Sequence, residues 1–166
     1  VITLLGNNPV TLEVGTSYTD AGATATDDID GDISESIITG GDAVDVNTLG
    51  AYTITYNVSD AAGNPATEVS RTVNVVDTTS PVITLLGDKP VSQEVGTTYT
   101  DAGATANDNY DGNITAGIIT VNPVDSNTPG TYTVTYNITD SSGNAADEVT
   151  RTVNVADTTE PVITLL

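Results

Sequence analysis

The chain has 166 residues and carries 23 acidic residues against only 3 basic ones, which gives a formal net charge of −20. This charge excludes nucleic acid as a partner, because such binding needs a basic surface that displaces counterions from phosphate, and it argues against an anionic membrane surface. The chain also has no cysteine, no apolar run long enough to predict insertion into a membrane and no signal-peptide pattern, so the start at Val1 is expected to be a cut from a longer protein.

The first half of the chain consists of short segments rich in Val, Ile, Thr and Tyr, separated by Gly, Asn, Asp and Pro. This pattern predicts strands joined by turns. In the segment 52–58, Tyr52, Ile54 and Tyr56 share one face, and Thr53 and Thr55 share the other, as in a half-buried strand. Seven strands are predicted, over residues 1–5, 10–14, 18–26, 36–39, 43–46, 51–59 and 67–76.

The second half of the chain repeats the first. VITLLG at 1–6 recurs at 82–87, and RTVNV at 71–75 recurs at 151–155. The sequence therefore predicts an all-β fold of two tandem immunoglobulin-like β-sandwich modules with about seven strands each. We expect module 1 at 1–77, a linker at 78–81, module 2 at 82–157, and at 158–166 a linker with the first strand of a truncated third repeat.

The apolar core of each module is expected to be thin. The chain has seven Tyr but no Phe, Trp or Met, so Val, Ile, Leu, Ala and the Tyr rings must form the core. A module this small buries only about 60% of its unfolded surface and is marginally stable. An additional stabiliser is therefore expected in each module.

Arg71 interrupts the apolar face of the last predicted strand of module 1. It shares that face with Val69, Val73 and Val75, and Arg151 repeats the anomaly in module 2. An unpaired guanidinium is costly to bury. We expect a bulge or an ion pair at the sandwich edge, rather than a binding role.

Two acidic loops recur in both modules. One is Asp27–Asp32, matched by Asn107–Asn113, and the other is Asp60–Asn64, matched by Asp140–Asn144. Closely spaced carboxylates repel one another unless a cation lies among them, and Ca²⁺ accepts six to eight oxygen ligands in loose geometry. An EF-hand is excluded, because Thr39 stands where the bidentate glutamate would be, so the alternatives are a calcium site with ligands from several loops or solvated acidic turns.

Immunoglobulin-like topology predicts how such a site is assembled. The B–C and F–G loops lie at the end of the sandwich where the chain enters, so the linker aspartate of the preceding module should meet both acidic loops. The predicted Ca²⁺ ligands at the junction are Asp77, Asp108, Asp111, Asn113, Asp140 and Asn144. The matching half-site of module 1 comprises Asp27, Asp28, Asp30, Asp32, Asp60 and Asn64, while Asp157 and Glu160 would serve a following module.

The repeated motifs resemble a known group, the bacterial immunoglobulin-like repeats of large surface proteins, with wider likeness to hyalin repeats and cadherins. The resemblance rests on YTDAGATA at 18–25 and 99–106, on the G-x-YT-x-TYN-x-x-D-x-x-GN run at 50–64 and 130–144, and on the linker 77–81. It implies an extracellular array that acts as an adhesive stalk or a spacer, stiffened by calcium in its cadherin-like members. Asp77 takes the place of the linker aspartate, and one ion per junction is expected because Thr78, Thr79 and Ser80 follow it.

The expected function is that of a non-catalytic, calcium-stabilised extracellular stalk or spacer in a bacterial adhesin or secreted surface protein. The chain has no His, and its close carboxylates are explained by Ca²⁺, so an enzyme is not expected. The alternative is a carbohydrate-binding module of a secreted polysaccharide-degrading enzyme, for which Tyr110 is the one tyrosine without a counterpart in module 1. The expected partners are neighbouring repeats and a cell-surface or polysaccharide ligand, and the chain is expected to be a monomer.

Overall fold

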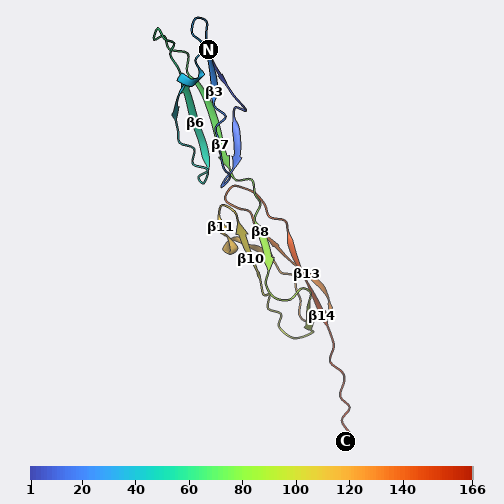
Figure 1. Cartoon of the computed structure of the whole chain (residues 1–166). Coiled ribbons are helices and arrows are strands. Elements are labelled where there is room, and N and C mark those ends of the chain that lie inside the picture. The colour runs from blue at the N-terminus through green and yellow to red at the C-terminus, as the bar shows by residue number, and fades with distance from the viewer. Residues whose placement is uncertain (166) are drawn as a thin grey trace. The chain divides into compact units, whose positions relative to one another are not determined.

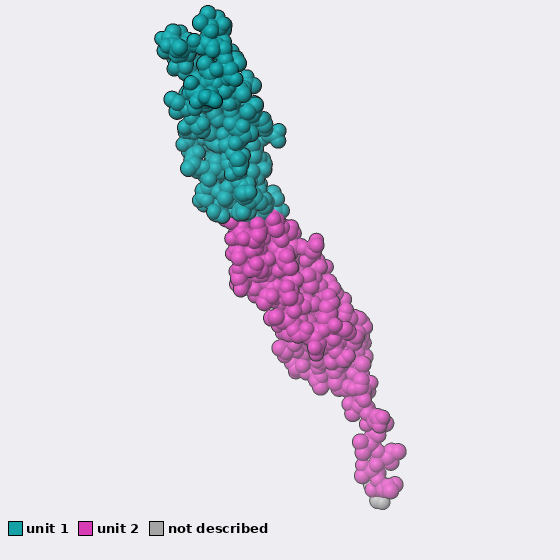
Figure 2. Space-filling view, viewed as in Figure 1, with its two compact units in different colours: residues 1–78 teal, residues 79–166 magenta. Residues whose placement is uncertain are grey.

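The computed structural model describes residues 1–165. These residues divide into two compact units, Val1–Thr78 (unit 1) and the part from Thr79 onward (unit 2). Figure 1 traces the strands of each unit, and Figure 2 colours unit 1 teal and unit 2 magenta. No helix among the described residues is long and apolar enough to cross a membrane.

Unit 1 contains seven strands and one short 3-10 helix. In chain order they are β1 (Ile2–Leu4), β2 (Val10–Glu13), β3 (Ala23–Asp27), β4 (Gly31–Asp32), η1 (Ser34–Ser36), β5 (Ile38–Gly41), β6 (Gly50–Asn57) and β7 (Val69–Val76). They form a three-stranded sheet in the order β1-β3-β4 and a four-stranded sheet in the order β2-β7-β6-β5. All pairs are antiparallel except β2 and β7, which run parallel with Glu13 opposite Val76.

Unit 2 repeats this arrangement element by element. Its elements are β8 (Val82–Leu85), β9 (Val91–Glu94), β10 (Ala104–Asp108), β11 (Gly112–Asn113), η2 (Thr115–Gly117), β12 (Ile119–Val121), β13 (Gly130–Asn137) and β14 (Val149–Ala156). The sheets have the orders β11-β10-β8 and β12-β13-β14-β9. The two units confirm the predicted all-β fold of tandem immunoglobulin-like sandwiches.

The core of each unit lies between the inner faces of its two sheets. In unit 1, Ile2 and Ala25 of the smaller sheet pack with Ile54, Tyr56 and Val73 of the larger one. Alternation along β6 and β7 turns these apolar side chains inward, and the same pattern in β13 and β14 builds the core of unit 2.

The strand prediction was wrong in two places. Residues 43–46 are not a strand. They lie in the loop that joins the neighbouring strands β5 and β6, and Val44 packs against the core without pairing with another strand. Asp45 instead caps a turn by accepting hydrogen bonds from the Asn47 amide (3.0 Å) and the Thr48 hydroxyl (2.8 Å). Strand β4, which pairs with the end of β3, was not predicted.

The third predicted strand, 18–26, is shorter than expected. It begins only at Ala23, because Tyr18 and Asp20 are held in a polar network at the edge of the core. Gly22 then turns the chain with φ of 74°, a conformation that glycine adopts at little cost.

Candidate metal centre

Asp108 lies at the end of β10 and organises the tight turn that leads into β11. Its Oδ1 accepts hydrogen bonds from the amides of Tyr110 (2.8 Å) and Asp111 (3.0 Å), which is the usual way in which an aspartate closes a turn. Gly112 completes the turn with φ of 68°. The other oxygen, Oδ2, is buried and has no hydrogen-bond partner, and the residue is only 3% exposed. The turn therefore uses one carboxylate oxygen of Asp108 and leaves the other for a different partner.

Asp27 makes the same turn in unit 1. Its Oδ1 accepts hydrogen bonds from the amides of Ile29 (3.0 Å) and Asp30 (3.1 Å). These two bonds lower the pKa of Asp27, although burial and the nearby charge of Asp60 act in the opposite direction. Asp27 is thus ionised at neutral pH, as a cation ligand must be.

Asp140 begins the second acidic loop of unit 2, and Asn144 closes it. The Asn144 amide donates to Asp140 Oδ1 at 2.7 Å, and its side-chain Nδ2 donates to Oδ2 at 2.8 Å. Burial raises the pKa of Asp140, but the hydrogen bonds from Asn144 outweigh it, and the pKa lies below its ordinary value. Asp60 and Asn64 form the same closed loop in unit 1, with both distances 2.7 Å.

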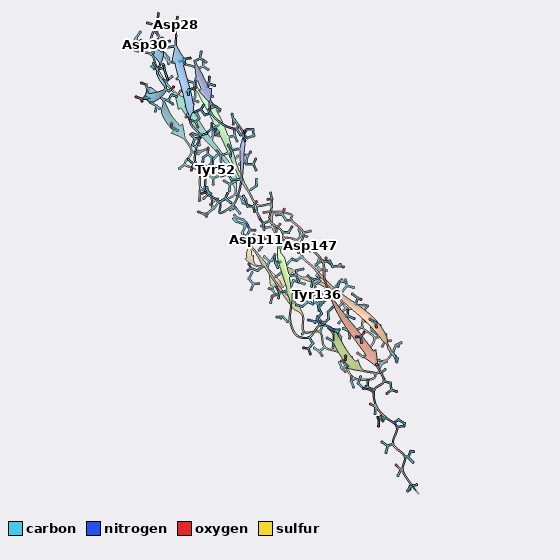
Figure 3. All side chains as sticks on the ribbon, turned by 45° about the vertical axis from the view of Figure 1, so that its right-hand side comes forward. Asp28, Asp30, Tyr52, Asp111, Tyr136 and Asp147 are labelled. Atoms are coloured by element: carbon cyan, nitrogen blue, oxygen red, sulfur yellow. The ribbon has the colours of Figure 1, made fainter. Side chains whose placement is uncertain are left out.

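The two acidic loops of each unit are tied to one another. Asp111 accepts hydrogen bonds from the Ser141 amide through Oδ2 and from the Ser141 hydroxyl through Oδ1, both at 2.7 Å. In unit 1 the Ala61 amide donates to Asp30 Oδ2 at 2.8 Å. Both loops therefore lie at the same end of their sandwich, where Figure 3 labels Asp28 and Asp30 in unit 1 and Asp111 in unit 2.

The remaining predicted ligands have other surroundings. Asp32 Oδ1 accepts hydrogen bonds from the amide (3.0 Å) and hydroxyl (2.6 Å) of Ser34, and Asn113 Oδ1 accepts one from the Thr115 amide (3.0 Å). These side chains thus hold the 3-10 turns. Asp28 is exposed in the β3–β4 turn.

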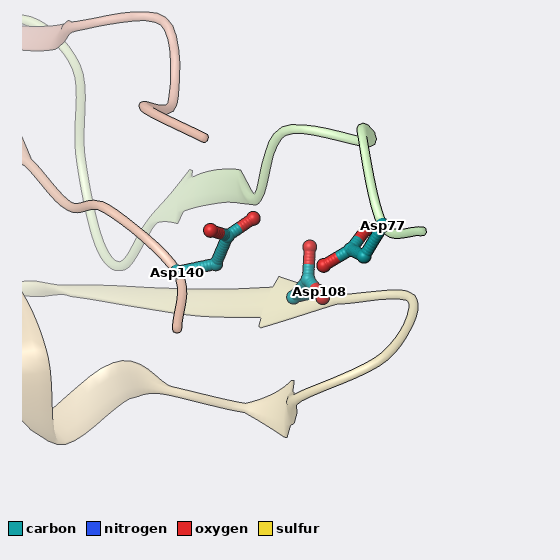
Figure 4. A group of neighbouring side chains, drawn as sticks. All are labelled: Asp77, Asp108 and Asp140. Carbon is teal, nitrogen blue, oxygen red and sulfur yellow. The ribbon is translucent and has the colours of Figure 1, made fainter. Parts of the chain in front are cut away.

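Asp77 follows β7 directly and is 7% exposed. One carboxylate oxygen each of Asp77, Asp108 and Asp140 lies within 4.8 Å of those of the other two. Figure 4 draws the three side chains. Among residues 1–165 this is the one such group of three. Three more ligands were predicted for this site, namely Asp111, Asn113 and Asn144. They lie in the same two loops and make the local hydrogen bonds described above.

The geometry of this group fits a calcium ion. Oxygens bound to one Ca²⁺ can be at most about 5 Å apart, twice the usual Ca–O distance of about 2.4 Å. Three carboxylates placed this close would repel one another, and a cation bound among them would offset that repulsion. The buried Oδ2 of Asp108 provides an oxygen that a cation could take without breaking a hydrogen bond.

Unit 1 has the corresponding loops around a small pocket. The pocket has a volume of about 130 Å³, and its polar lining includes Asp27, Asp60 and Asn64. Asp28, Asp30 and Asp32 do not line it. Unit 1 thus presents two of the three carboxylate positions found in the group of Asp77, Asp108 and Asp140.

The anomalous arginines belong to a different site within each unit. Arg71 is 1% exposed and pairs with Asp20, which also accepts hydrogen bonds from Tyr56 (2.6 Å) and Tyr18 (3.0 Å). Arg71 also donates to the carbonyl oxygens of Leu5 and Gly22. The expected ion pair is confirmed, whereas the alternative of a bulge is wrong because the β6–β7 register runs unbroken through Arg71.

Neither Asp20 nor its counterpart Asp101, which pairs with Arg151, was predicted from the sequence to have a role. The signal was present in the repeated motif Tyr-Thr-Asp at 18–20 and 99–101. Its link to an arginine about fifty residues further along the chain could be seen only once the strands were folded.

The fold and these recurring loops define the chain as a tandem immunoglobulin-like repeat. It belongs to the family described as "Bacterial surface protein, Ig-like domain", whose model matches residues 2–75 and again 83–155. This match agrees with the resemblance inferred from the repeated motifs.

Several known proteins contain similar sequences. Hyalin of Lytechinus variegatus is 41% identical over 73% of this chain and 24% of its own length. The pesticidal crystal protein Cry22Aa of Bacillus thuringiensis is 31% identical over 75% of this chain and 17% of its own length. An uncharacterised 81.3 kDa protein of Acholeplasma phage L2 is 35% identical over 83% of this chain and 19% of its own length. The chain thus spans less than a quarter of these relatives.

Two solved structures match the chain with low TM-scores. A structure of the CBM51-2 domain in complex with GlcNAc and INT domains from Clostridium perfringens ZmpB covers 47% of this chain and 17% of its own, with 30% identity and a TM-score of 0.39. The lipoprotein BT2262 of Bacteroides thetaiotaomicron covers 91% of this chain and 98% of its own, with 17% identity and a TM-score of 0.42.

Proposed function

We propose that the chain is a non-catalytic stalk or spacer segment of an extracellular bacterial protein, and that Ca²⁺ bound by Asp77, Asp108 and Asp140 stabilises and stiffens successive modules. The observation that carries this proposal is the convergence of three buried carboxylates, one of which has an oxygen without a hydrogen-bond partner. The family match supports the surface location, because its description names bacterial surface proteins.

The ligand set favours Ca²⁺ over Mg²⁺. Both ions prefer oxygen, but Mg²⁺ demands near-ideal octahedral geometry at about 2.1 Å and gives up its water reluctantly. Each carboxylate oxygen of Asp140 accepts a hydrogen bond from Asn144 and keeps a further lone pair that a cation could use. Water and backbone carbonyls would complete the six to eight ligands of Ca²⁺.

Binding of calcium to the folded chain alone would raise its stability. The gain is RT ln(1 + [Ca²⁺]/Kd), or about 2.7 kcal/mol at a hundredfold excess over Kd. A change of 1 kcal/mol in the free energy of unfolding moves Tm by about 4–8 °C for a domain of 60–100 residues. We therefore expect Tm to rise by about 10–20 °C when EDTA is replaced by saturating CaCl₂, and to change much less with MgCl₂.

Matched variants in the two units test where the ion binds. Asp108→Asn keeps an oxygen that can close the turn but lowers the charge of the site, and should abolish most of the calcium-dependent rise in Tm. Asp27→Asn makes the same change at the equivalent turn of unit 1 and should leave the rise nearly unchanged. Asp77→Asn should behave like Asp108→Asn, because both residues belong to the group of three.

Two results would contradict the proposal. One is a wild-type Tm that is equal in EDTA and in CaCl₂. The other is a calcium-dependent rise that persists in full in both Asp108→Asn and Asp77→Asn, since the ion would then bind elsewhere.

A further inference from the structure

A glutamate in each unit holds the segment that leaves the last strand. In unit 1, Glu13 ends β2, and its carboxylate accepts hydrogen bonds from the backbone amide of Thr78 (2.9 Å to Oε2) and from the Thr78 hydroxyl (2.7 Å). β2 runs parallel to β7, so Glu13 lies beside Val76, the last residue of β7. The contact therefore continues the β2–β7 pairing beyond the end of β7.

Unit 2 repeats the arrangement. Glu94 ends β9 opposite Ala156, and its Oε2 accepts hydrogen bonds from the amide (3.0 Å) and the hydroxyl of Thr158. The Thr159 hydroxyl donates to Glu94 Oε1 at 2.9 Å. Because the contact occurs independently in both units, it is a property of the module.

We infer that Glu13 and Glu94 are positioning residues that fix the Asp-Thr-Thr segment after β7 and β14, and that Glu13 thereby orients Asp77 for the cation. The inference rests on the proposed calcium site. The backbone is held on both sides of Asp77, since the Val14 amide donates to the Val76 carbonyl at 2.7 Å on one side and Glu13 holds Thr78 on the other. Asp77 is thus constrained before an ion arrives, which lowers the entropy lost on binding.

The role assigned to Glu13 differs from that of a ligand. Its carboxylate is not one of the three that converge and instead contacts the amide and the hydroxyl of Thr78. Such supporting residues commonly contribute about 10–100-fold to metal affinity when they hold a ligand in place.

The two glutamates provide a matched test. Glu13→Ala should weaken calcium affinity about tenfold, as measured by isothermal titration calorimetry. Glu94→Ala removes the same contact after β14, where the segment carries Asp157 instead of Asp77, and should change the Kd less than twofold. Glu13→Gln keeps one acceptor oxygen for the Thr78 amide and should recover part of the lost affinity. Equal affinities of wild type and Glu13→Ala would overturn the inference, and so would an equal loss in Glu94→Ala.

Amide hydrogen exchange followed by NMR in EDTA separates the positioning contact from calcium binding. Thr78 should exchange faster in Glu13→Ala, and Thr158 in Glu94→Ala, with the amides of the core strands unchanged. If wild type binds no calcium, the proposed function fails. The contact between Glu13 and Thr78 is tested separately, by amide hydrogen exchange at Thr78. Unchanged exchange at Thr78 in Glu13→Ala would overturn it.

Discussion

Asp101, Arg151 and Tyr136 form a buried polar network inside an otherwise apolar core. Arg151 is fully buried and donates to Asp101, to the Gly103 carbonyl (3.1 Å) and to the Tyr136 hydroxyl (3.0 Å). Its guanidinium also lies 5.7 Å from the centre of the Tyr136 ring. A charge can be buried in this way only because nearly all of its donors find acceptors.

Removal of the acid from this network should strongly destabilise unit 2. Asp101→Ala leaves the Arg151 charge buried without its partner, and we expect a loss of about 3–5 kcal/mol in the free energy of unfolding. Urea unfolding monitored by tyrosine fluorescence measures the loss, and Asp147→Ala, at an exposed position, serves as a control. A loss below about 1 kcal/mol would show that the ion pair does not stabilise the fold.

The same network should make stability depend on pH. Burial raises the pKa of Asp101, but the hydrogen bonds from Tyr136 and Tyr99 and the charge of Arg151 lower it below the ordinary value of 3.8. The unfolded chain thus binds more protons than the folded chain between the two pKa values. The contribution of Asp101 is present above pH 3.8 and is lost as the pH falls through its folded-state pKa. Comparison of Asp101→Asn with wild type between pH 2 and 5 should show a smaller fall in stability for the variant, and parallel curves would contradict this account.

At the scale of elements, the sequence predicted the strands that alternate and missed features that depend on single turns. β6 and β7 were predicted well, because apolar and polar residues alternate along them. β4 has only two residues and exists because Asp27 and Gly31 close the preceding turn. The pairing of Asp20 with Arg71, and the holding of Thr78 by Glu13, join distant segments and became visible only with the sheet register.

Gly41 illustrates how a single residue can control an element. It ends β5 with φ of 85°, and a Cβ there would lie 2.2 Å from the Thr53 carbonyl oxygen of β6. Gly41→Ala should therefore displace β5 and destabilise unit 1 by more than about 2 kcal/mol, whereas Gly15→Ala, with φ of 79° and no atom near the added Cβ, should cost about 1 kcal/mol. Thermal unfolding compares the two variants, and equal losses would show that contact with β6 does not determine this position.

At the scale of the whole molecule, the repeat itself explains how much of the candidate site could be predicted. Duplicated acidic loops and a linker aspartate placed Asp77, Asp108 and Asp140 among the predicted ligands before the fold was known. The sequence could not distinguish these three residues from Asp111 or Asn113, because which side-chain oxygens converge depends on how the loops fold. The assignment of Ca²⁺ to the group stays a prediction.

Calcium should also restrict the motion of one module relative to the next. An ion held by the linker aspartate and both acidic loops would link these segments, so we expect small-angle scattering to give a narrower distance distribution in CaCl₂ than in EDTA. Asp108→Asn should give the EDTA-type distribution in both buffers. Identical wild-type distributions in the two buffers would leave calcium with no part in stiffening the stalk.

The most direct test of the calcium site is titration of the wild-type chain with CaCl₂ by isothermal titration calorimetry. We expect one ion per chain to bind at the group of Asp77, Asp108 and Asp140, with a Kd of roughly 0.1–1 mM, as in other extracellular calcium modules. Binding should be lost in Asp108→Asn and retained in Asp27→Asn. Absence of calcium binding to wild type, or binding that Asp108→Asn leaves unchanged, would contradict the proposed calcium site.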